Sequence, residues 1–160
     1  MTRRRTQTEV PFAAEQMFDL VADVERYPEF IPYCIGLRVV TRDVDIAGDG
    51  DVCADMLVAY KVFREKFRSR ARLDRSNMRI DVAYVDGPFR RLSNVWRFES
   101  LPDGGGVIDF EIDFEFRNLM LQSTANAVFE KAFAKMSDAF VARAYDVYAP
   151  TDATAPISSA

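Results

Sequence analysis

The sequence predicts an α+β fold in which a curved antiparallel sheet of about seven strands wraps around one long C-terminal helix. Apolar residues recur at every second position in stretches between residues 35 and 116, and short turn sequences separate these stretches. The spacing changes to a helical one over residues 119–147. The length of 160 residues fits a single domain, placed at residues 1–150, with a small polar tail at 151–160 that is expected to be disordered.

The N-terminal part of the chain predicts one strand followed by two short helices. Residues 2–10 alternate weakly and are expected to form a strand that ends at Pro11. Residues 13–22 have apolar side chains at helical spacing. Pro28 and Pro32 restrict the residues that precede them, so only a short helical turn fits between these two prolines.

Six further strands are predicted, and short turns rich in Gly, Pro, Asp or Asn separate most of them. Successive strands joined in this way pair antiparallel. The predicted strands occupy residues 35–41, 52–60, 63–73, 78–84, 92–98 and 108–116.

Residues 119–147 predict the long helix. The stretch contains no Gly or Pro and is rich in Ala, which favours an uninterrupted helix. About 27 helical residues at 1.5 Å each make a rod of roughly 40 Å, which needs a broad apolar surface to pack against. The sheet is the element that can supply this surface, and Pro150 marks the end of the helix.

The composition excludes several classes of function. The chain has no His, so it lacks the commonest general base and the commonest metal ligand, and we expect neither catalytic residues nor a metal site. Cys34 and Cys53 are expected to be free thiols. Neither a signal peptide nor a membrane span is recognisable, which predicts a cytoplasmic location. The net charge of −4 argues against binding nucleic acid through overall charge, and no DNA partner is expected.

One face of the strand at residues 63–73 is strongly basic. This face is either a solvated outer surface paired with neighbouring acidic side chains, or a contact surface for anionic lipid headgroups or RNA. The basic side chains are Arg64, Lys66, Arg68, Arg70 and Arg72.

A row of carboxylates on the strand at residues 108–116 mirrors the basic face. Alternate strand positions lie about 7 Å apart, which is wide for a shared metal ion. The spacing does not fix which strands are neighbours, so the pairing of the two rows stays open. The acidic side chains are Asp109, Glu111, Asp113 and Glu115.

Glu65 is unusual because strict alternation places it on the apolar face with Phe63 and Phe67. A buried carboxylate needs a partner or takes up a proton. Glu65 therefore lies either at a bulge or wet edge of the sheet, or inside a cavity where it meets the polar head of a ligand. Asn94 raises the same question in a milder form.

Aromatic and methionine side chains are abundant on the predicted inner faces. Most are expected to form the core, although such an excess also allows an apolar cavity. These residues are Trp96, Phe98, Phe110, Phe114, Phe129, Phe133, Met136 and Phe140.

Two segments carry a family resemblance, together with the order of the elements. The first segment is Tyr27-Pro28-Glu29-Phe30-Ile31-Pro32-Tyr33-Cys34. The second is Asp86-Gly87-Pro88-Phe89-Arg90-Arg91-Leu92, which is followed by Trp96-Arg97-Phe98. They resemble the motifs Tyr-Pro-x-Phe-x-Pro-(Trp/Tyr)-Cys and Asp-Gly-Pro-Phe-x-x-Leu…Trp-x-Phe of the coenzyme Q-binding START-domain family. That family lies within the wider polyketide cyclase and lipid-transport superfamily, and the resemblance covers roughly residues 3–147.

The resemblance implies a helix-grip fold with a hydrophobic tunnel between the sheet and the C-terminal helix. It implies a non-enzymatic carrier for ubiquinone or another prenyl lipid that supports respiratory electron transport, without a further cofactor. It also implies an alternative, a ribosome-associating toxin-like regulator that blocks subunit joining. A cyclase-type enzyme is a third class, for which the chain offers only carboxylates, Tyr and Lys as acids or bases.

Candidate ligand-binding residues follow from the resemblance and the periodicity together. The segment Tyr27–Cys34 is expected near the tunnel mouth, and the basic strand face would make any contact with a ribosome or, peripherally, with the inner membrane. The residues expected at the tunnel wall or mouth are Tyr27, Phe30, Pro32, Glu65, Phe67, Trp96, Phe98, Phe114, Phe129, Phe133 and Met136.

Overall fold

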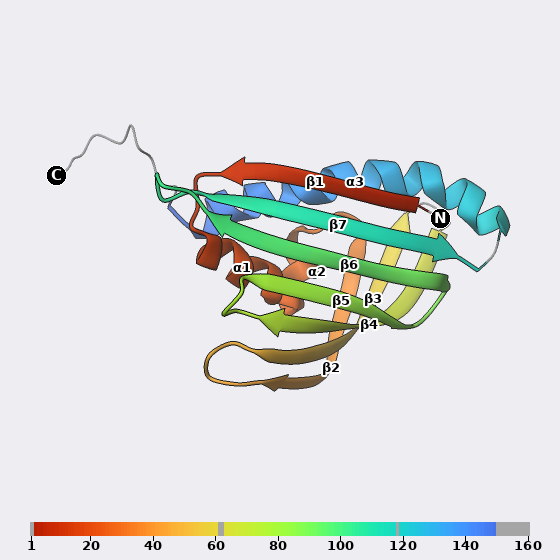
Figure 1. Cartoon of the computed structure of the whole chain (residues 1–160). Coiled ribbons are helices and arrows are strands. Elements are labelled where there is room, and N and C mark those ends of the chain that lie inside the picture. The colour runs from red at the N-terminus through yellow and green to blue at the C-terminus, as the bar shows by residue number, and fades with distance from the viewer. Residues whose placement is uncertain (1, 61–62, 118, 150–160) are drawn as a thin grey trace.

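The computed structural model describes residues 2–60, 63–117 and 119–149, and the predicted tail at 151–160 lies outside them. Its seven strands form one antiparallel sheet in the order β1-β7-β6-β5-β4-β3-β2 (Figure 1). The α+β prediction is therefore confirmed. The strands are β1 (Thr2–Val10), β2 (Cys34–Val44), β3 (Gly50–Tyr60), β4 (Phe63–Asp74), β5 (Arg79–Asp86), β6 (Phe89–Ser100) and β7 (Gly106–Phe116).

The sheet is curved, and irregularities in strand register accompany its bends. Register shifts occur in β2 between Cys34 and Gly36 and again between Val39 and Thr41. A further shift separates Arg68 from Ser69 where β4 pairs with β5. An extra residue in one strand of a pair bends that strand and increases its twist, which favours a concave sheet.

The connection between β1 and β2 covers one end of the concave face. Because β1 and β2 form opposite edges of the sheet, this connection has to cross its whole width. It contains α1 (Ala14–Ala22), the 3₁₀ turn η1 (Val24–Arg26) and α2 (Tyr27–Phe30). The apolar side of α1 meets the sheet through Phe18, whose ring centroid lies 5.7 Å from that of Phe98.

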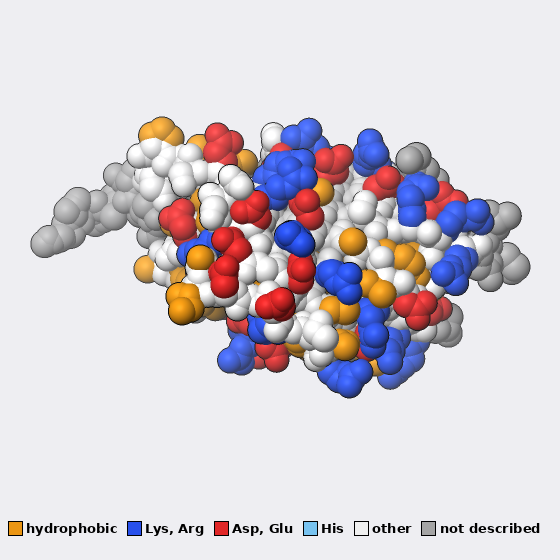
Figure 2. Space-filling view, turned by 60° about the horizontal axis from the view of Figure 1, so that its bottom comes forward, with side chains coloured by type: hydrophobic (Ala, Val, Ile, Leu, Met, Phe, Trp, Pro, Cys, Tyr) orange, Lys and Arg blue, Asp and Glu red, His pale blue; other side chains and the backbone are white. Residues whose placement is uncertain are grey.

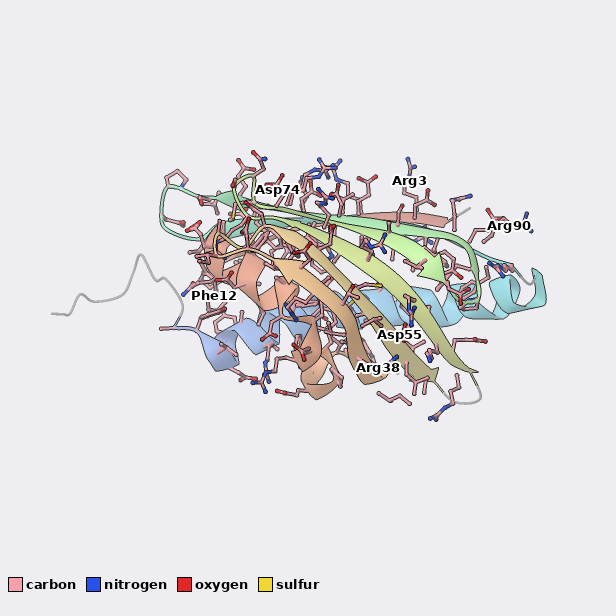
Figure 3. The ribbon with its side chains drawn as sticks, turned by 90° about the horizontal axis from the view of Figure 1, so that it is seen from below. Arg3, Phe12, Arg38, Asp55, Asp74 and Arg90 are labelled. Carbon is pink, nitrogen blue, oxygen red and sulfur yellow. The ribbon has the colours of Figure 1, made fainter. Side chains whose placement is uncertain are left out.

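The long helix α3 (Leu119–Val147) lies along the inner face of the sheet (Figures 1 and 3). The rings of Phe110 on β7 and Phe133 on α3 stack with their centroids 5.5 Å apart. Further along the helix, Phe140 packs edge-on against Trp96 of β6 at 5.1 Å. These contacts come from one apolar side of α3, as its helical spacing predicted.

Ion pairs on the outer face are arranged strand by strand. Asp109 and Asp113 of β7 pair with Arg5 and Arg3 of β1, and Arg91 of β6 also reaches Asp113. The acidic row of β7 does not meet the basic row of β4, because β6 and β5 lie between them. The order of the strands, which the spacing left open, therefore pairs the acidic row of β7 with β1 and β6 and the basic row of β4 with β3.

The basic face of β4 is only partly neutralised. Arg68 and Arg72 pair with aspartates of the neighbouring β3. Arg64 and Arg70 form no ion pair within the part of the chain that the structure describes. In Figure 2, basic side chains gather toward the right and lower side of the view.

Asp55 is the buried charge that holds β2, β3 and β4 together on this face. Its side chain is only 6% exposed, and its two oxygens accept hydrogen bonds from Arg68 Nε at 2.7 Å and Nη2 at 3.0 Å. Arg38 of β2 lies 3.4 Å away and Lys66 4.0 Å away (Figure 3). The Arg68 hydrogen bonds, aided by these charges, lower the pKa of Asp55 from 3.8 to about 2.

We predict that Asp55→Asn lowers the free energy of unfolding by about 1–2 kcal/mol at pH 7, because the ion pairs are lost while the arginines stay partly solvated. A depressed folded-state pKa stabilises the fold above pH 4, and this contribution disappears as the pH falls toward 2. Urea unfolding of the wild type and of Asp55→Asn, at pH 7 and near pH 2, measures the difference in the free energy of unfolding.

Asp51→Asn is the matched control, since Asp51 is 39% exposed in its pair with Arg72. It should change stability by less than about 0.5 kcal/mol. Equal losses in the two variants would contradict the role given to Asp55.

Candidate ligand-binding cavity

A cavity of about 250 Å³ lies between the concave face of the sheet and the helices. Its wall is almost entirely apolar, with side chains from β2 to β7, α1, η1, α2 and α3. The strands contribute from their inner faces, where every second residue points toward α3. The apolar lining includes Val21, Val24, Leu37, Val52, Met56, Val82, Leu92, Phe110 and Phe140.

The structure brings most of the predicted tunnel residues to this wall. Phe30, Phe98 and Phe114 are not among the lining residues. The side chain of Phe129 lies outside the described residues. The predicted residues that line the cavity are Tyr27, Pro32, Glu65, Phe67, Trp96, Phe133 and Met136.

The three residues away from the wall are packed by other aromatic rings. Phe30 packs edge-on against Phe140 at 5.3 Å, and Phe98 packs against α1 as described above. Phe114 is fully buried beside Phe89 and Phe116. Strand alternation identifies the inner face correctly, but it cannot tell which inner residues are covered by neighbours.

Small residues on the inner face of the sheet, which were not predicted from the sequence, leave room for the cavity. Ala54 of β3 lies directly opposite Ser69 of β4, and Ala71 lies opposite Val52. All four line the cavity. Small side chains on adjacent strands leave a volume that a single helix cannot fill. Their occurrence on otherwise bulky strand faces was the available signal.

The segment from Tyr27 to Cys34 covers one part of the cavity. The Tyr27 hydroxyl donates a hydrogen bond to the Val21 carbonyl, and its ring packs edge-on against Phe140 at 5.5 Å. Burial raises the pKa of Tyr27 well above its usual value, so the hydroxyl stays protonated. Burial also raises the pKa of Cys34 to about 11, which leaves a neutral thiol at pH 7.

The same segment is fastened to the C-terminal half of α3. Glu29 accepts hydrogen bonds from Arg26 at 2.9 Å and from Arg143 of α3 at 2.8 Å. The Arg143 guanidinium also lies over the Phe30 ring, 5.1 Å from its centroid. These contacts explain why the segment combines aromatic and charged side chains, and they fix it over the cavity.

Three polar side chains of the sheet face the cavity. Glu65 pairs with Val58 in regular register, so it lies at the cavity wall without a bulge. Ser69, in the middle of β4, also lines the cavity. Asn94 Oδ1 accepts a hydrogen bond from Trp96 Nε1 at 3.1 Å. The cavity therefore offers an apolar volume with a few hydrogen-bonding groups, which is typical of sites for hydrophobic ligands.

The segment Asp86-Gly87-Pro88-Phe89 forms another part of the wall. Gly87 has a φ of +146°, and a Cβ atom there would lie 2.6 Å from the Cβ of Phe67. The absence of a side chain lets the β5–β6 turn close over β4. Phe89 then packs against Phe67 at 5.5 Å and against Phe116 at 4.6 Å.

Comparison with known proteins agrees with this architecture. Residues 10–141 match the family described as polyketide cyclase / dehydrase and lipid transport. The chain belongs to this family. The matched residues include the strands from β2 to β7, the helices between β1 and β2 and most of α3, and hence every described residue that lines the cavity. No helix within the described residues is long and apolar enough to cross a membrane.

Two curated relatives of the chain carry different names. The chain is 37% identical over 139 residues to the ribosome association toxin RatA of Escherichia coli K12, covering 87% of this chain and 84% of that protein. It is 29% identical over 135 residues to the mitochondrial coenzyme Q-binding protein COQ10 of Drosophila melanogaster, covering 82% of this chain and 54% of that protein.

Solved structures share the fold. The 18 kDa protein CC1736 of Caulobacter crescentus is 35% identical, with a TM-score of 0.75 over 92% of this chain and 98% of that one. The Zhui aromatase/cyclase of Streptomyces has a TM-score of 0.79 over 92% of this chain and 96% of that one, at 18% identity. The second likeness concerns the fold alone.

We predict that Gly87→Ala lowers the free energy of unfolding by about 1–3 kcal/mol, because the new methyl group meets Phe67 in a strained backbone conformation. Gly36→Ala is the control, since its Cβ would lie 3.7 Å from Leu57, an ordinary contact. Thermal unfolding of both variants measures the effect, and equal melting temperatures would refute it.

Proposed function

We propose that this protein binds a hydrophobic ligand, ubiquinone or a similar prenyl lipid, in the cavity between the sheet and α3, and carries it without chemical change. The apolar cavity of about 250 Å³ is the observation that carries the proposal. The COQ10 relative, named as coenzyme Q-binding, supports the ligand class. This function fits a cytoplasmic protein that meets the inner membrane peripherally and supports respiratory electron transport.

The volume limits how much of a ligand is enclosed. A cavity of about 150 Å³ lined by apolar side chains is large enough for benzene, so this one accommodates a substituted ring with several further carbons. Each buried methylene contributes about 0.8 kcal/mol, which makes the apolar part of the ligand the main source of affinity. A long polyprenyl tail exceeds this volume, and its remainder would extend beyond the cavity.

The groups around the cavity favour binding over catalysis. Tyr27 is protonated with its hydroxyl engaged, and Cys34 is a neutral thiol. Glu65 is the acidic side chain among the described lining residues, and these contain no cationic side chain that would stabilise a developing negative charge. The likeness to an aromatase/cyclase, at 18% identity, concerns the fold and does not argue for that chemistry.

Ala71→Leu should reduce binding of decyl-ubiquinone at least about tenfold, because the larger side chain projects into the cavity that Ala71 lines. Binding can be followed by quenching of Trp96 fluorescence and confirmed by equilibrium dialysis. The matched control is Ala83→Leu, an exposed position on the neighbouring strand. If wild type binds no quinone and preparations from a quinone-producing host carry no lipid, the proposal fails.

Ribosome association is the second candidate function. Several curated relatives are named ribosome association toxins, and the chain covers 84% of the Escherichia coli K12 protein. The outer face of β4 supports it physically, because Arg64 and Arg70 form no ion pair among the described residues and remain available for phosphates. This face lies opposite the cavity, so both functions can coexist.

Reversing Arg64 and Arg70 to Glu should reduce co-sedimentation with ribosomal subunits several-fold at low salt, because two cations without an ion pair among the described residues are replaced by anions. The control reverses Lys131 and Lys135, which are exposed on α3, and produces the same change in net charge. Equal losses in both double variants would show a net-charge effect and count against a specific basic face.

A further inference from the structure

Asn94 holds its amide in a defined orientation toward the cavity. Trp96 Nε1 lies 3.1 Å from the oxygen of the Asn94 side chain. An indole N–H can only donate, so the atom that it contacts must be Oδ1 and not the amide nitrogen. Trp96 therefore fixes the orientation of the Asn94 amide. Nδ2, with its two hydrogens, lies on the side of the amide that does not contact Trp96.

The indole that orients this amide is itself closely packed. The Trp96 ring lies 4.1 Å from the ring of Phe110 and 5.1 Å from that of Phe140. Trp96 is 7% exposed and lies opposite Ile80 and Phe110 in the sheet. Because the ring cannot rotate without disturbing the contact between the sheet and α3, the hydrogen bond to Asn94 is preorganised.

The amide nitrogen has no partner within the described part of the chain. Its only side-chain hydrogen bond there is the one to Trp96, although Asn94 lines an otherwise apolar wall between Val82 and Ile112. A donor facing an apolar cavity is unfavourable unless a ligand or water supplies an acceptor. The geometry therefore provides an unused donor inside the cavity.

Asn94 suits this role better than Glu65 does, because an amide always carries N–H donors whereas a carboxyl group mainly offers acceptor oxygens. Glu65 is also the third residue of β4, close to the β3–β4 turn, whereas Asn94 lies in the middle of β6. A polar head that accepts hydrogen bonds is thus directed toward Asn94 and away from Glu65.

We propose that Asn94 Nδ2 donates a hydrogen bond to a carbonyl oxygen of the ligand, and that Trp96 is the residue that positions the amide. This inference rests on the ligand binding proposed above. The ligand class is then an apolar ring that carries a carbonyl group.

Fluorenone and fluorene test this inference, because these rigid molecules have nearly the same shape and differ by one carbonyl oxygen. Equilibrium dialysis should show that wild type prefers fluorenone by about 5- to 10-fold, the effect of one hydrogen bond. The infrared C=O stretch of bound fluorenone should shift to lower frequency relative to its value in hydrocarbon solvent.

Two variants locate the donor. Asn94→Leu removes the amide at similar volume, and Asn94→Val removes it with a side chain that favours a strand. Both should abolish the preference for fluorenone and the infrared shift while leaving fluorene binding within about twofold. Ser69→Ala is the control at another polar lining position and should retain the preference. Asn94→Val keeps the inference testable if Asn94→Leu fails to fold.

The outcomes separate the two proposals. If fluorene and fluorenone bind wild type equally, or if both Asn94 variants retain the preference, the role of Asn94 is overturned while ligand binding stands. If neither these probes nor decyl-ubiquinone bind wild type, the proposed function itself fails and this inference fails with it.

Discussion

One helix has to cover the concave face of a seven-stranded sheet, and this mismatch in width shapes the rest of the molecule. Six strand spacings of about 4.8 Å make a flat sheet nearly 30 Å wide, whereas a helix with its side chains is about 10–12 Å across. The sheet curves, and α1, η1 and α2 cover one end. Where Ala54, Ser69 and Ala71 leave space, a cavity remains.

Different interactions stabilise the two faces of the sheet. On the inner face, apolar contacts such as Trp96 with Phe140 hold α3 in place and leave a volume suited to a hydrophobic ligand. On the outer face, charges are balanced strand by strand, with Asp55 buried under three cations. Because the faces are separated by the sheet itself, a ligand on one side and a polyanionic partner on the other need not compete.

The two segments that carry the family resemblance have structural explanations. The segment from Tyr27 to Cys34 joins α2 to α3 through Glu29 and Arg143, and the turn at Gly87 lets β5 and β6 close over Phe67. Both segments also border the cavity. Both segments therefore have a structural role at the wall of the cavity.

The sequence by itself determined the order of the elements, the inner and outer faces of the strands and the apolar side of the long helix, because these depend on local periodicity. Only the tertiary structure decided that β1 pairs with β7, since pairing between distant strands has no local signal. It also separated Phe98 and Phe114, covered by neighbours, from the cavity residues. The orientation of the Asn94 amide required Trp96 to be in place, because one hydrogen bond between two side chains on the same strand face fixes it.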